Sequence, residues 1–438
     1  MSKNFRVRAA GLLAVLFLSV ALMTGPLVGA QQGGAATSVA PTNTKSAAVM
    51  AATAEVLKET SEIRELSILR PVKSGAQSRA EIERMIIKNL NEETKPEETR
   101  ASEVALKKLG LVPRDFNFRS FIVKLLTEQV AGYYDPKVQE FYLADWIDLD
   151  GQKPVIAHEL VHALQDQHFN LRRFEKWPKG DSDAEMAAHA LIEGDATLAM
   201  IRYVTRDLQR AAAFAKSLGS DGSSSEQIDN APRALRESLL FPYERGSQWV
   251  THLYRKGGWP LVSKAFTDLP QSTEQILHAD KYFAREAPVK VDIEDLRAGL
   301  GARWKRIDYD VNGEWGYYLI LNEYLKMGAD GAASGWSGDR FAVYEEPQTA
   351  QVFIAQMTMW DTDADAQEFF DAYARRTEAR YAGTSQLEMT ASAGGQAKAW
   401  RTPADGRVLM ELRGRRVVIL EGVPEKADAN LLLKKVWG

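Results

Sequence analysis

The segment from Pro154 to Leu164 most constrains the fold, because it places His158, Glu159 and His162 on an otherwise apolar helical pattern. Residues four apart on an α-helix differ by only about 40° in direction, so both imidazoles project from one face. The apolar neighbours predict that the helix is buried. The chain must therefore fold so that two buried imidazoles contact a group or an ion that satisfies their polar nitrogen atoms.

This pattern is typical of a hydrolytic zinc site. Two neutral imidazoles suit Zn²⁺, and a catalytic zinc has three protein ligands and keeps its fourth position for water. Glu159 follows the first histidine, where its carboxylate can act on that water as general base. A chance match or a hydrogen-bonded histidine pair is the alternative, yet two of only six histidines in the chain lie here. We expect His158 and His162 to bind zinc and Glu159 to be catalytic.

Three downstream residues compete for the third ligand position. His168 requires the helix to break at Gln165, which adopts the left-handed conformation poorly. Asp181 is placed to cap the next helix. Glu193 lies mid-helix among small and apolar residues, where an isolated carboxylate is unfavourable and a nearby cation removes the penalty. Glu193 is the predicted third ligand, and an ion pair between Glu193 and an arginine is the alternative.

Further residues are candidates for supporting this site. Gly194 predicts a close approach of its helix to the zinc helix, and His189 and Asp195 are candidates for orienting the ligands. Tyr243, in a segment expected to precede an amphipathic helix, and His278 are candidates by residue type for donating to a developing oxyanion. A structural role is the alternative for both, because no spacing fixes their distance from the metal.

With these residues the chain resembles the gluzincin zinc peptidases, in which HExxH and a downstream glutamate form a His₂Glu site. It also looks like a group of uncharacterised exported bacterial proteins, over about residues 56–285. Their three motifs read here His158-Glu-Leu-Val-His-Ala-Leu-Gln-Asp-Gln-His168, Glu193-Gly-Asp-Ala196 and Ser272-Thr-Glu-Gln-Ile-Leu-His278. The resemblance implies a zinc-dependent, peptidase-like domain.

The N-terminal sequence predicts export. Three basic residues precede the apolar run 9–23, and small residues at 28–30 predict cleavage of a signal peptide, residues 1–30. An uncleaved segment would instead anchor the protein to a membrane, and no later segment is apolar enough to span one. Cleavage removes three positive charges and no acidic residue, which changes the net charge from −4 to −7.

Composition excludes several other classes of function. The absence of cysteine excludes disulfides and thiol catalysis. No basic stripe indicates nucleic-acid binding. The predicted partner is a peptide or protein substrate, the predicted location is the periplasm or the outside of the cell, and the oligomeric state stays open.

The predicted fold class is α+β. After a flexible leader (31–54), we expect an N-terminal helical region (55–130) and a mainly helical zincin-like domain with a small antiparallel sheet (131–327). That domain contains a strand at 139–144 and a helix at 183–208. In zincins, the strand at this place is an edge strand that pairs with the backbone of the substrate. A linker (328–338) leads to a C-terminal α/β module (339–438). Within this module we expect strands at 351–360, 397–402 and 407–420 and helices at 363–380 and 425–437.

These features predict an exported zinc metallopeptidase that hydrolyses peptide bonds with a zinc-bound water activated by Glu159. The alternative is a catalytically inactive, zinc-stabilised binding or assembly protein of the cell envelope. A third interpretation is a peptidase that its own N-terminal helices restrain as a pro-segment.

Overall fold

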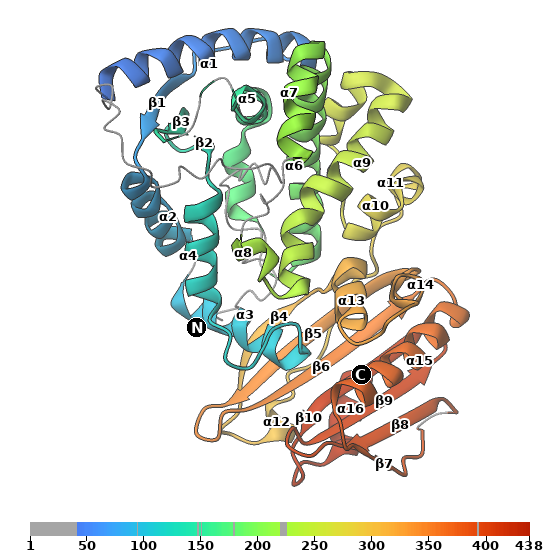
Figure 1. The fold of residues 1–438 in the computed structure, drawn as a ribbon. Helices are drawn as coiled ribbons and strands as arrows, with labels where there is room; N and C mark the ends of the chain where they lie inside the picture. Colours follow the sequence, from blue (N-terminus) through green and yellow to red (C-terminus); the bar gives the residue numbers. More distant parts are fainter. Residues whose placement is uncertain are drawn as a thin grey trace, which may run out of the picture.

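The structure is a computed structural model and describes residues 42–93, 95–146, 149, 151–177, 180–219, 226–391 and 394–438. The expected α+β class is confirmed: a helical part comes first, and a seven-stranded sheet follows at the C-terminal end (Figure 1). The predicted signal peptide, residues 1–30, lies outside the described residues. Within the described part of the chain, no helix combines the length and the apolar character that crossing a membrane requires.

The helical part is organised around α5 (Lys153–Phe169), which is buried without interruption from Pro154 to Asp166. The helices α1 (Thr42–Arg64) and α6 (Ser182–Thr205) pack against it, and α9 (Arg233–Ala265) packs along α6. A helix that is enclosed on all sides must be apolar all round. The few polar side chains of α5 therefore need partners inside the protein.

Shorter helices complete this part of the molecule. They are α2 (Arg79–Glu93), α3 (Pro96–Leu109), α4 (Phe118–Gln129), η1 (Leu171–Lys176), α7 (Leu208–Gly219), α8 (Glu226–Asp229), α10 (Thr273–Leu277), α11 (Ala279–Ala284) and α13 (Gly313–Asn322). The short helix α12 (Arg297–Leu300) lies instead at the C-terminal sheet (Figure 1).

The N-terminal boundary expected at residue 54 is wrong. Residues 42–54, expected to belong to a flexible leader, form the first half of α1. Val49, Ala52 and Val56 are buried at helical spacing. The alanine-rich composition predicted a linker, but alanine also has the highest helix propensity. Packing against α5 and α6 stabilises this segment as a helix.

A three-stranded sheet of order β1-β3-β2 lies beside α5. β3 (Glu140–Ala144) confirms the strand expected at 139–144, but it is the central strand and not an edge. It pairs in parallel with β1 (Lys73–Gln77) and antiparallel with β2 (Gly132–Asp135). The sheet is therefore mixed. We missed β1 because Lys-Ser-Gly-Ala-Gln contains no β-branched or aromatic residue.

The C-terminal sheet has the order β4-β5-β6-β10-β9-β8-β7, and every pair is antiparallel. Its strands are β4 (Lys305–Asp310), β5 (Trp336–Glu346), β6 (Gln351–Trp360), β7 (Ser385–Leu387), β8 (Gln396–Arg401), β9 (Arg407–Arg413) and β10 (Arg416–Val423). The strand expected at 407–420 is two strands that turn at Gly414, where φ is 52°. The expected linker contains α14 (Ala329–Ala333), and the sheet begins with β4, before the predicted boundary.

Helices pack against both faces of this sheet. Ile354 and Val417 share a core with Phe369 of α15 (Asp363–Arg380), the helix expected at 363–380. Phe353 and Val418, which alternate with them along the strands, share a core with α16 (Ala429–Trp437). Successive side chains of a strand point to opposite faces of the sheet, and apolar residues at both sets of positions make both faces apolar.

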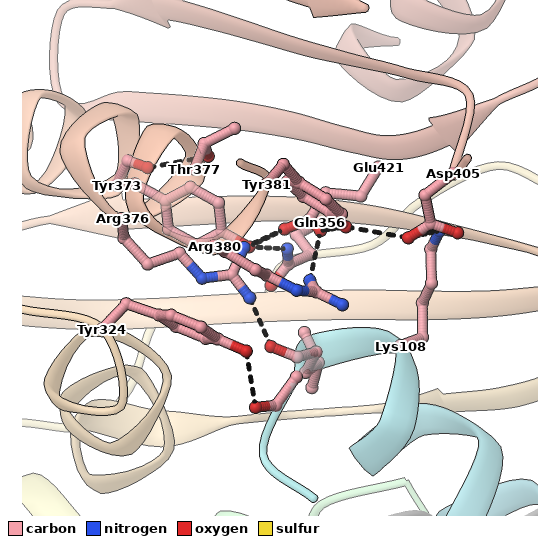
Figure 2. Close-up of polar contacts among 12 residues, drawn as sticks. Lys108, Tyr324, Gln356, Tyr373, Arg376, Thr377, Arg380, Tyr381, Asp405 and Glu421 are labelled. Carbon is pink, nitrogen blue, oxygen red and sulfur yellow. Dashed lines mark hydrogen bonds and ion pairs between the residues drawn. The ribbon is translucent and has the colours of Figure 1, made fainter. Parts of the chain in front are cut away.

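The end of α3 docks onto the sheet through buried polar contacts (Figure 2). Arg376 of α15 donates to the carbonyl of Leu109, and Tyr324 donates to the carbonyl of Gly110 at 3.0 Å. Nζ of Lys108 lies 3.0 Å from Asp405. These groups satisfy carbonyls that the last turn of a helix leaves without partners. The N-terminal helical region and the C-terminal sheet are thereby joined directly.

Candidate metal centre

Three predicted ligand atoms meet between α5 and α6. Nε2 of His158 lies 3.1 Å from Nε2 of His162, and Oε2 of Glu193 lies 3.1 Å from the first and 3.5 Å from the second. The two imidazoles project from the same face of α5, one turn apart, and Glu193 faces them from the middle of α6. Two adjacent helices thus bring all three predicted ligands together.

The spacing of these atoms fits a tetrahedral metal ion. Donors about 2.0–2.1 Å from a tetrahedral zinc lie roughly 3.3 Å from one another, which is close to the 3.1, 3.1 and 3.5 Å measured here. Two nitrogen lone pairs at 3.1 Å repel each other unless a proton or a cation lies between them. The geometry of the three donors therefore suits a divalent ion with two nitrogen ligands and one oxygen ligand.

Charge in the cluster favours the same conclusion. Burial opposes a charge on Glu193, yet the two histidines hold the pKa of this carboxyl well below its usual range. Burial also opposes a charge on His162, but the Glu193 carboxylate raises the pKa of His162 to about 9. Burial lowers the pKa of His158. An ionised carboxylate here requires one positive charge beside it, which a proton or a metal ion supplies.

Gln165 fixes which nitrogen of His162 carries the proton. Its amide nitrogen donates to the carbonyl of Ile192 at 3.0 Å and to Oδ2 of Asp195 at 2.9 Å. Its amide oxygen must therefore face His162, where it lies 2.8 Å from Nδ1. Nδ1 is the donor in this pair, and Nε2 of the neutral ring keeps its lone pair for a metal.

Glu159, the predicted base, is fully buried beside the cluster. Its Oε2 accepts a hydrogen bond from the backbone N–H of Tyr134 in β2 at 3.0 Å, and its Oε1 has no hydrogen-bond partner among the residues that the structure describes. Burial raises the pKa of Glu159 well above its usual range. One oxygen is thus fixed by the edge strand, and the other is available to a proton on a small molecule in the site.

Tyr243, a predicted oxyanion donor, also lies at the cluster. Its ring stacks on His158, with centroids 6.1 Å apart. Burial and the carboxylates of Glu193 and Glu159 raise the pKa of Tyr243 well above its usual value, so the hydroxyl keeps its proton. Tyr243 lies within α9, whereas we expected its segment to precede a helix.

Gly194 has a different partner from the one predicted. We expected it to bring α6 close to α5, but a Cβ atom on Gly194 would collide with the backbone of Gly246 in α9. The glycine pair lets α6 and α9 cross closely, and this crossing sets Tyr243, one turn before Gly246, beside His158. A close approach of α6 to another helix was predicted correctly, but that helix is α9 and not α5.

The structure places the remaining candidates elsewhere. Nε2 of His278 lies 2.8 Å from Oε1 of Glu314, and neither residue belongs to the ligand cluster. His168 meets the carbonyl of Ser67, and α5 continues through Gln165 without the break that the His168 alternative requires. Asp181 caps α6 by accepting from the N–H of Ala184, as expected.

Polar residues that follow His162 on α5 bind the segment 67–70, a role that the sequence did not predict. Asp166 accepts from the Tyr134 hydroxyl at 2.9 Å and from Arg70 at 2.8 Å. Oε1 of Gln167 accepts from the N–H groups of Leu69 and Arg70, and His168 meets Ser67. The signal was present, because a Gln-Asp-Gln-His run is unusually polar for the end of a buried helix.

A second group of acidic residues has a different character. Glu274, Glu286 and Asp361 lie close enough to share an ion, but Nζ of Lys281 lies between them at 2.6, 2.7 and 2.5 Å. The lysine supplies the positive charge in this group. It links α10 and α11 to the sheet through Asp361.

Comparisons with known proteins cover only the C-terminal part of the chain. Residues 302–433 match a family described as a domain of unknown function (DUF8575). No curated protein and no solved structure matches the chain. The matched residues correspond to the seven-stranded sheet with α15 and the start of α16. The ligand cluster, Glu159 and Tyr243 lie outside them.

Proposed function

We propose that the protein is a zinc-dependent peptide hydrolase with its active site between α5, α6 and α9. The observation that carries this proposal is the triangle formed by Nε2 of His158, Nε2 of His162 and Oε2 of Glu193. Beside it lies Oε1 of Glu159, which has no hydrogen-bond partner in the described part of the chain. A simple structural ion pair needs neither two converging nitrogen atoms nor a second buried carboxylate.

His158, His162 and Glu193 are the residues that would hold the ion, and two imidazoles with one carboxylate suit zinc. When bound, the metal supplies a Lewis acid and lowers the pKa of a water molecule towards about 7. The protein orients its donors in advance, since Gln165 fixes the ring of His162. The basic and apolar N-terminal sequence supports an exported enzyme.

Glu159 acts as the general base and then as the general acid. Its Oε1, which no described residue contacts by a hydrogen bond, accepts a proton from the attacking water, and burial of the carboxyl raises its pKa and so favours the protonated form. It then returns the proton to the departing amine of the cleaved peptide. The Tyr134 N–H holds the other oxygen in place, so the carboxylate stays oriented while its proton content changes.

Tyr243 stabilises the negative charge that develops on the substrate carbonyl oxygen. Its hydroxyl keeps a proton and interacts with the Glu193 carboxylate, while its ring stacks on His158. Side-chain exposure supports an approach from this side, since 15% of the Glu193 side chain reaches solvent and the Tyr243 ring is half-buried.

The substrate approaches as an extended strand along β2. This strand is the edge of the three-stranded sheet, and the N–H of Tyr134 is directed at Glu159 and not at β3. Gly132, Tyr133 and Tyr134 are buried, so a peptide that pairs with the outer edge of β2 enters the protein before it runs past Glu159. The substrate class is therefore an extended peptide or a protein segment.

The test combines metal analysis with digestion of a broad peptide library. The wild-type protein should hold one zinc per chain and cleave peptides. Glu159→Gln should keep the zinc and lose about 1000-fold or more in rate. Glu62→Gln on α1, where the side chain is 57% exposed, is the matched control and should behave as wild type. Equal cleavage by wild type and Glu159→Gln would remove the proposed mechanism.

A zinc-stabilised binding or assembly protein of the cell envelope is the second candidate. The almost complete burial of His158, Glu159 and His162, at 1%, 0% and 1% exposure, favours it. A structural zinc is part of folding, so its removal should melt the protein, whereas an enzyme loses activity and keeps its fold. Thermal unfolding with and without a chelator separates the two candidates.

A further inference from the structure

A hollow of about 500 Å³ lies between α9 and the segment formed by α10 and α11. Pockets that bind small ligands have volumes of about 300–1000 Å³. The lining includes His278, which the sequence suggested for catalysis, but none of the residues proposed to bind metal or to act in catalysis. The hollow is therefore separate from the candidate metal centre, and the proposed function gives it no role.

One face of α9 forms the first wall of the hollow. Four residues of α9 on this wall are Arg245, Gln248, His252 and Lys256. Their spacing of three or four residues places them on the same side of the helix. At about 1.5 Å per residue, the Cα atoms of Arg245 and Lys256 lie roughly 16 Å apart along the helix axis. An extended chain advances about 3.3 Å per residue, so this wall is long enough for about five residues of a peptide.

The two ends of this wall carry positive charges. Arg245 and Lys256 are both exposed, and neither forms an ion pair with a carboxylate within the part of the chain that the structure describes. Arg245 instead lies 3.3 Å from the amide oxygen of Gln248, and Nζ of Lys256 lies 3.6 Å from the centre of the Phe283 ring. The lining also contains the exposed carboxylate of Asp280. An anion that enters the hollow therefore reaches two cations without displacing a carboxylate from either of them.

The opposite wall is largely apolar and comes from α10 and α11. Leu277, Ala279 and Phe283 line it and are half-buried, so part of each side chain is open to a ligand. The Phe283 ring also lies 5.9 Å from the ring of His252, which brings this wall against the basic face of α9. The hollow thus combines separated positive charges with apolar surface.

Ion pairs and hydrogen bonds hold the α10–α11 wall in place. Nζ of Lys281 lies 2.6 Å from Glu274 of α10 and 2.5 Å from Asp361 at the end of β6. The hydroxyl of Tyr282 donates to the carbonyl of Asp268 at 2.8 Å. A wall that is fixed before binding lowers the conformational entropy lost when a ligand is bound.

We propose that this hollow binds a short acidic segment of an extended peptide or protein, with carboxylates at the two basic ends and an apolar side chain against the α10–α11 wall. The length of the basic face favours a peptide over a small anion. The formal net charge of the whole chain is −4, so an acidic peptide is attracted only where positive charge is concentrated. The inference applies to a hydrolase and to a binding protein alike.

The test measures binding of the peptide Glu-Ala-Leu-Ala-Glu, with blocked termini and a zwitterionic rhodamine label, to the full-length protein. Fluorescence anisotropy is read directly after mixing, before cleavage can remove the probe. Wild type should bind with a Kd below about 1 mM. Arg245→Ala/Lys256→Ala should weaken binding about 10-fold, and so should replacement of both glutamates of the probe by glutamine. Both substituted side chains are exposed, so the double variant keeps the fold.

Arg255→Ala/Lys264→Ala is the matched control. It removes the same charge from exposed positions of the same helix, and neither residue lines the hollow. At about 0.15 M salt, charges more than about 8 Å away are largely screened, so this variant should bind the probe within about twofold of wild type.

Three results would overturn the inference. Equal losses in the two double variants would show that only the overall charge attracts the probe. Displacement of the probe by succinate as readily as by the unlabelled peptide would identify a site for small anions. Failure of wild type to bind the probe would leave the hollow without the proposed ligand. Zinc content and peptide cleavage test the metal centre separately, because the hollow shares no residue with it.

Discussion

A Cβ atom on Gly194 of α6 would lie 2.3 Å from the carbonyl carbon of Gly246 on α9, so the two helices touch backbone to backbone. The reciprocal contact is equally close, because a Cβ atom on Gly246 would lie 2.2 Å from the carbonyl oxygen of Ala190. Backbone atoms cannot yield as a flexible side chain can. This crossing therefore sets the distance between α6, which carries Glu193, and α9, which carries Tyr243.

Gly246→Ala should separate α6 from α9 and destabilise the protein by about 2–4 kcal/mol, since the added methyl group overlaps backbone. Urea denaturation measures the change. The matched control is Gly331→Ala in α14, where the nearest atom is the flexible end of Glu368 at 3.3 Å. It should be neutral or should stabilise by up to about 1 kcal/mol. Similar effects at both positions would contradict the described helix crossing.

Tyr243→Phe should reduce the turnover of a cleaved peptide by about 10- to 1000-fold and leave zinc content unchanged. The hydroxyl acts on the developing oxyanion, whereas the ring keeps its stacking on His158. Steady-state kinetics and metal analysis provide the measurement. Tyr254→Phe on the same helix, whose ring packs on Trp259, is the control and should retain full turnover. Unchanged turnover in Tyr243→Phe would assign this residue a packing role.

His278→Gln should destabilise the fold without affecting zinc content, because His278 pairs with the buried Glu314 and not with the ligand cluster. The hydrogen bond to Glu314 raises the pKa of His278 above its ordinary value of 6.5. The folded state therefore binds this proton more tightly than the unfolded state, and the contribution is complete below the unfolded pKa. It is lost as pH rises through the folded pKa.

The measurement for His278 is the stability difference between wild type and His278→Gln at several pH values. The difference should be largest at mildly acidic pH and should shrink towards alkaline pH. A difference that grows as pH rises would have the wrong sign for this pair. Loss of zinc from His278→Gln would return the residue to the catalytic role first predicted.

Arg376→Met should destabilise the protein by about 3–5 kcal/mol, because it leaves buried Glu421 and the Leu109 carbonyl short of a partner (Figure 2). Arg401→Met removes the exposed ion pair with Glu425 from the same sheet and should change stability by less than about 1 kcal/mol. Chemical denaturation compares the two. Equal losses of stability in Arg376→Met and Arg401→Met would show that the contact between α3 and the sheet does not depend on Arg376.

Acid should weaken the same junction. Burial opposes ionisation of Glu421, but Arg376 and Arg380 hold its pKa at about 2. Its contribution to stability is therefore present above the unfolded pKa of roughly 4.3 and is lost as pH falls towards about 2. Glu421→Gln should flatten the acid dependence of unfolding between these values. An acid profile identical to wild type would contradict this assignment.

Local periodicity explains what the sequence could predict. Residues four apart on a helix must share a face, so His158 and His162 followed from their spacing. Glu193 followed from the penalty for an isolated buried carboxylate. The mostly apolar run at 351–360 predicted the strand that forms β6.

Contacts between distant segments account for most of what the sequence did not predict. The partners of Asp166, Gln167 and His168 lie about a hundred residues earlier, and nothing local in Ser67 to Arg70 marks them. β1 becomes a strand only because β3 offers it a parallel edge. The predicted helix partner of Gly194 was wrong for the same reason, since no short-range sequence pattern shows whether α5 or α9 packs against this glycine.

The hydrogen bond from Arg64 to Ser263 spans 199 residues of sequence. During synthesis, the cationic C-terminal end of α1 therefore cannot reach this partner until the C-terminal end of α9 has been made. Closing so large a loop is slow. The contact of Arg64 with Ser263 therefore forms only once residue 263 has been made, while the seven-stranded sheet, β4 to β10, is still to follow.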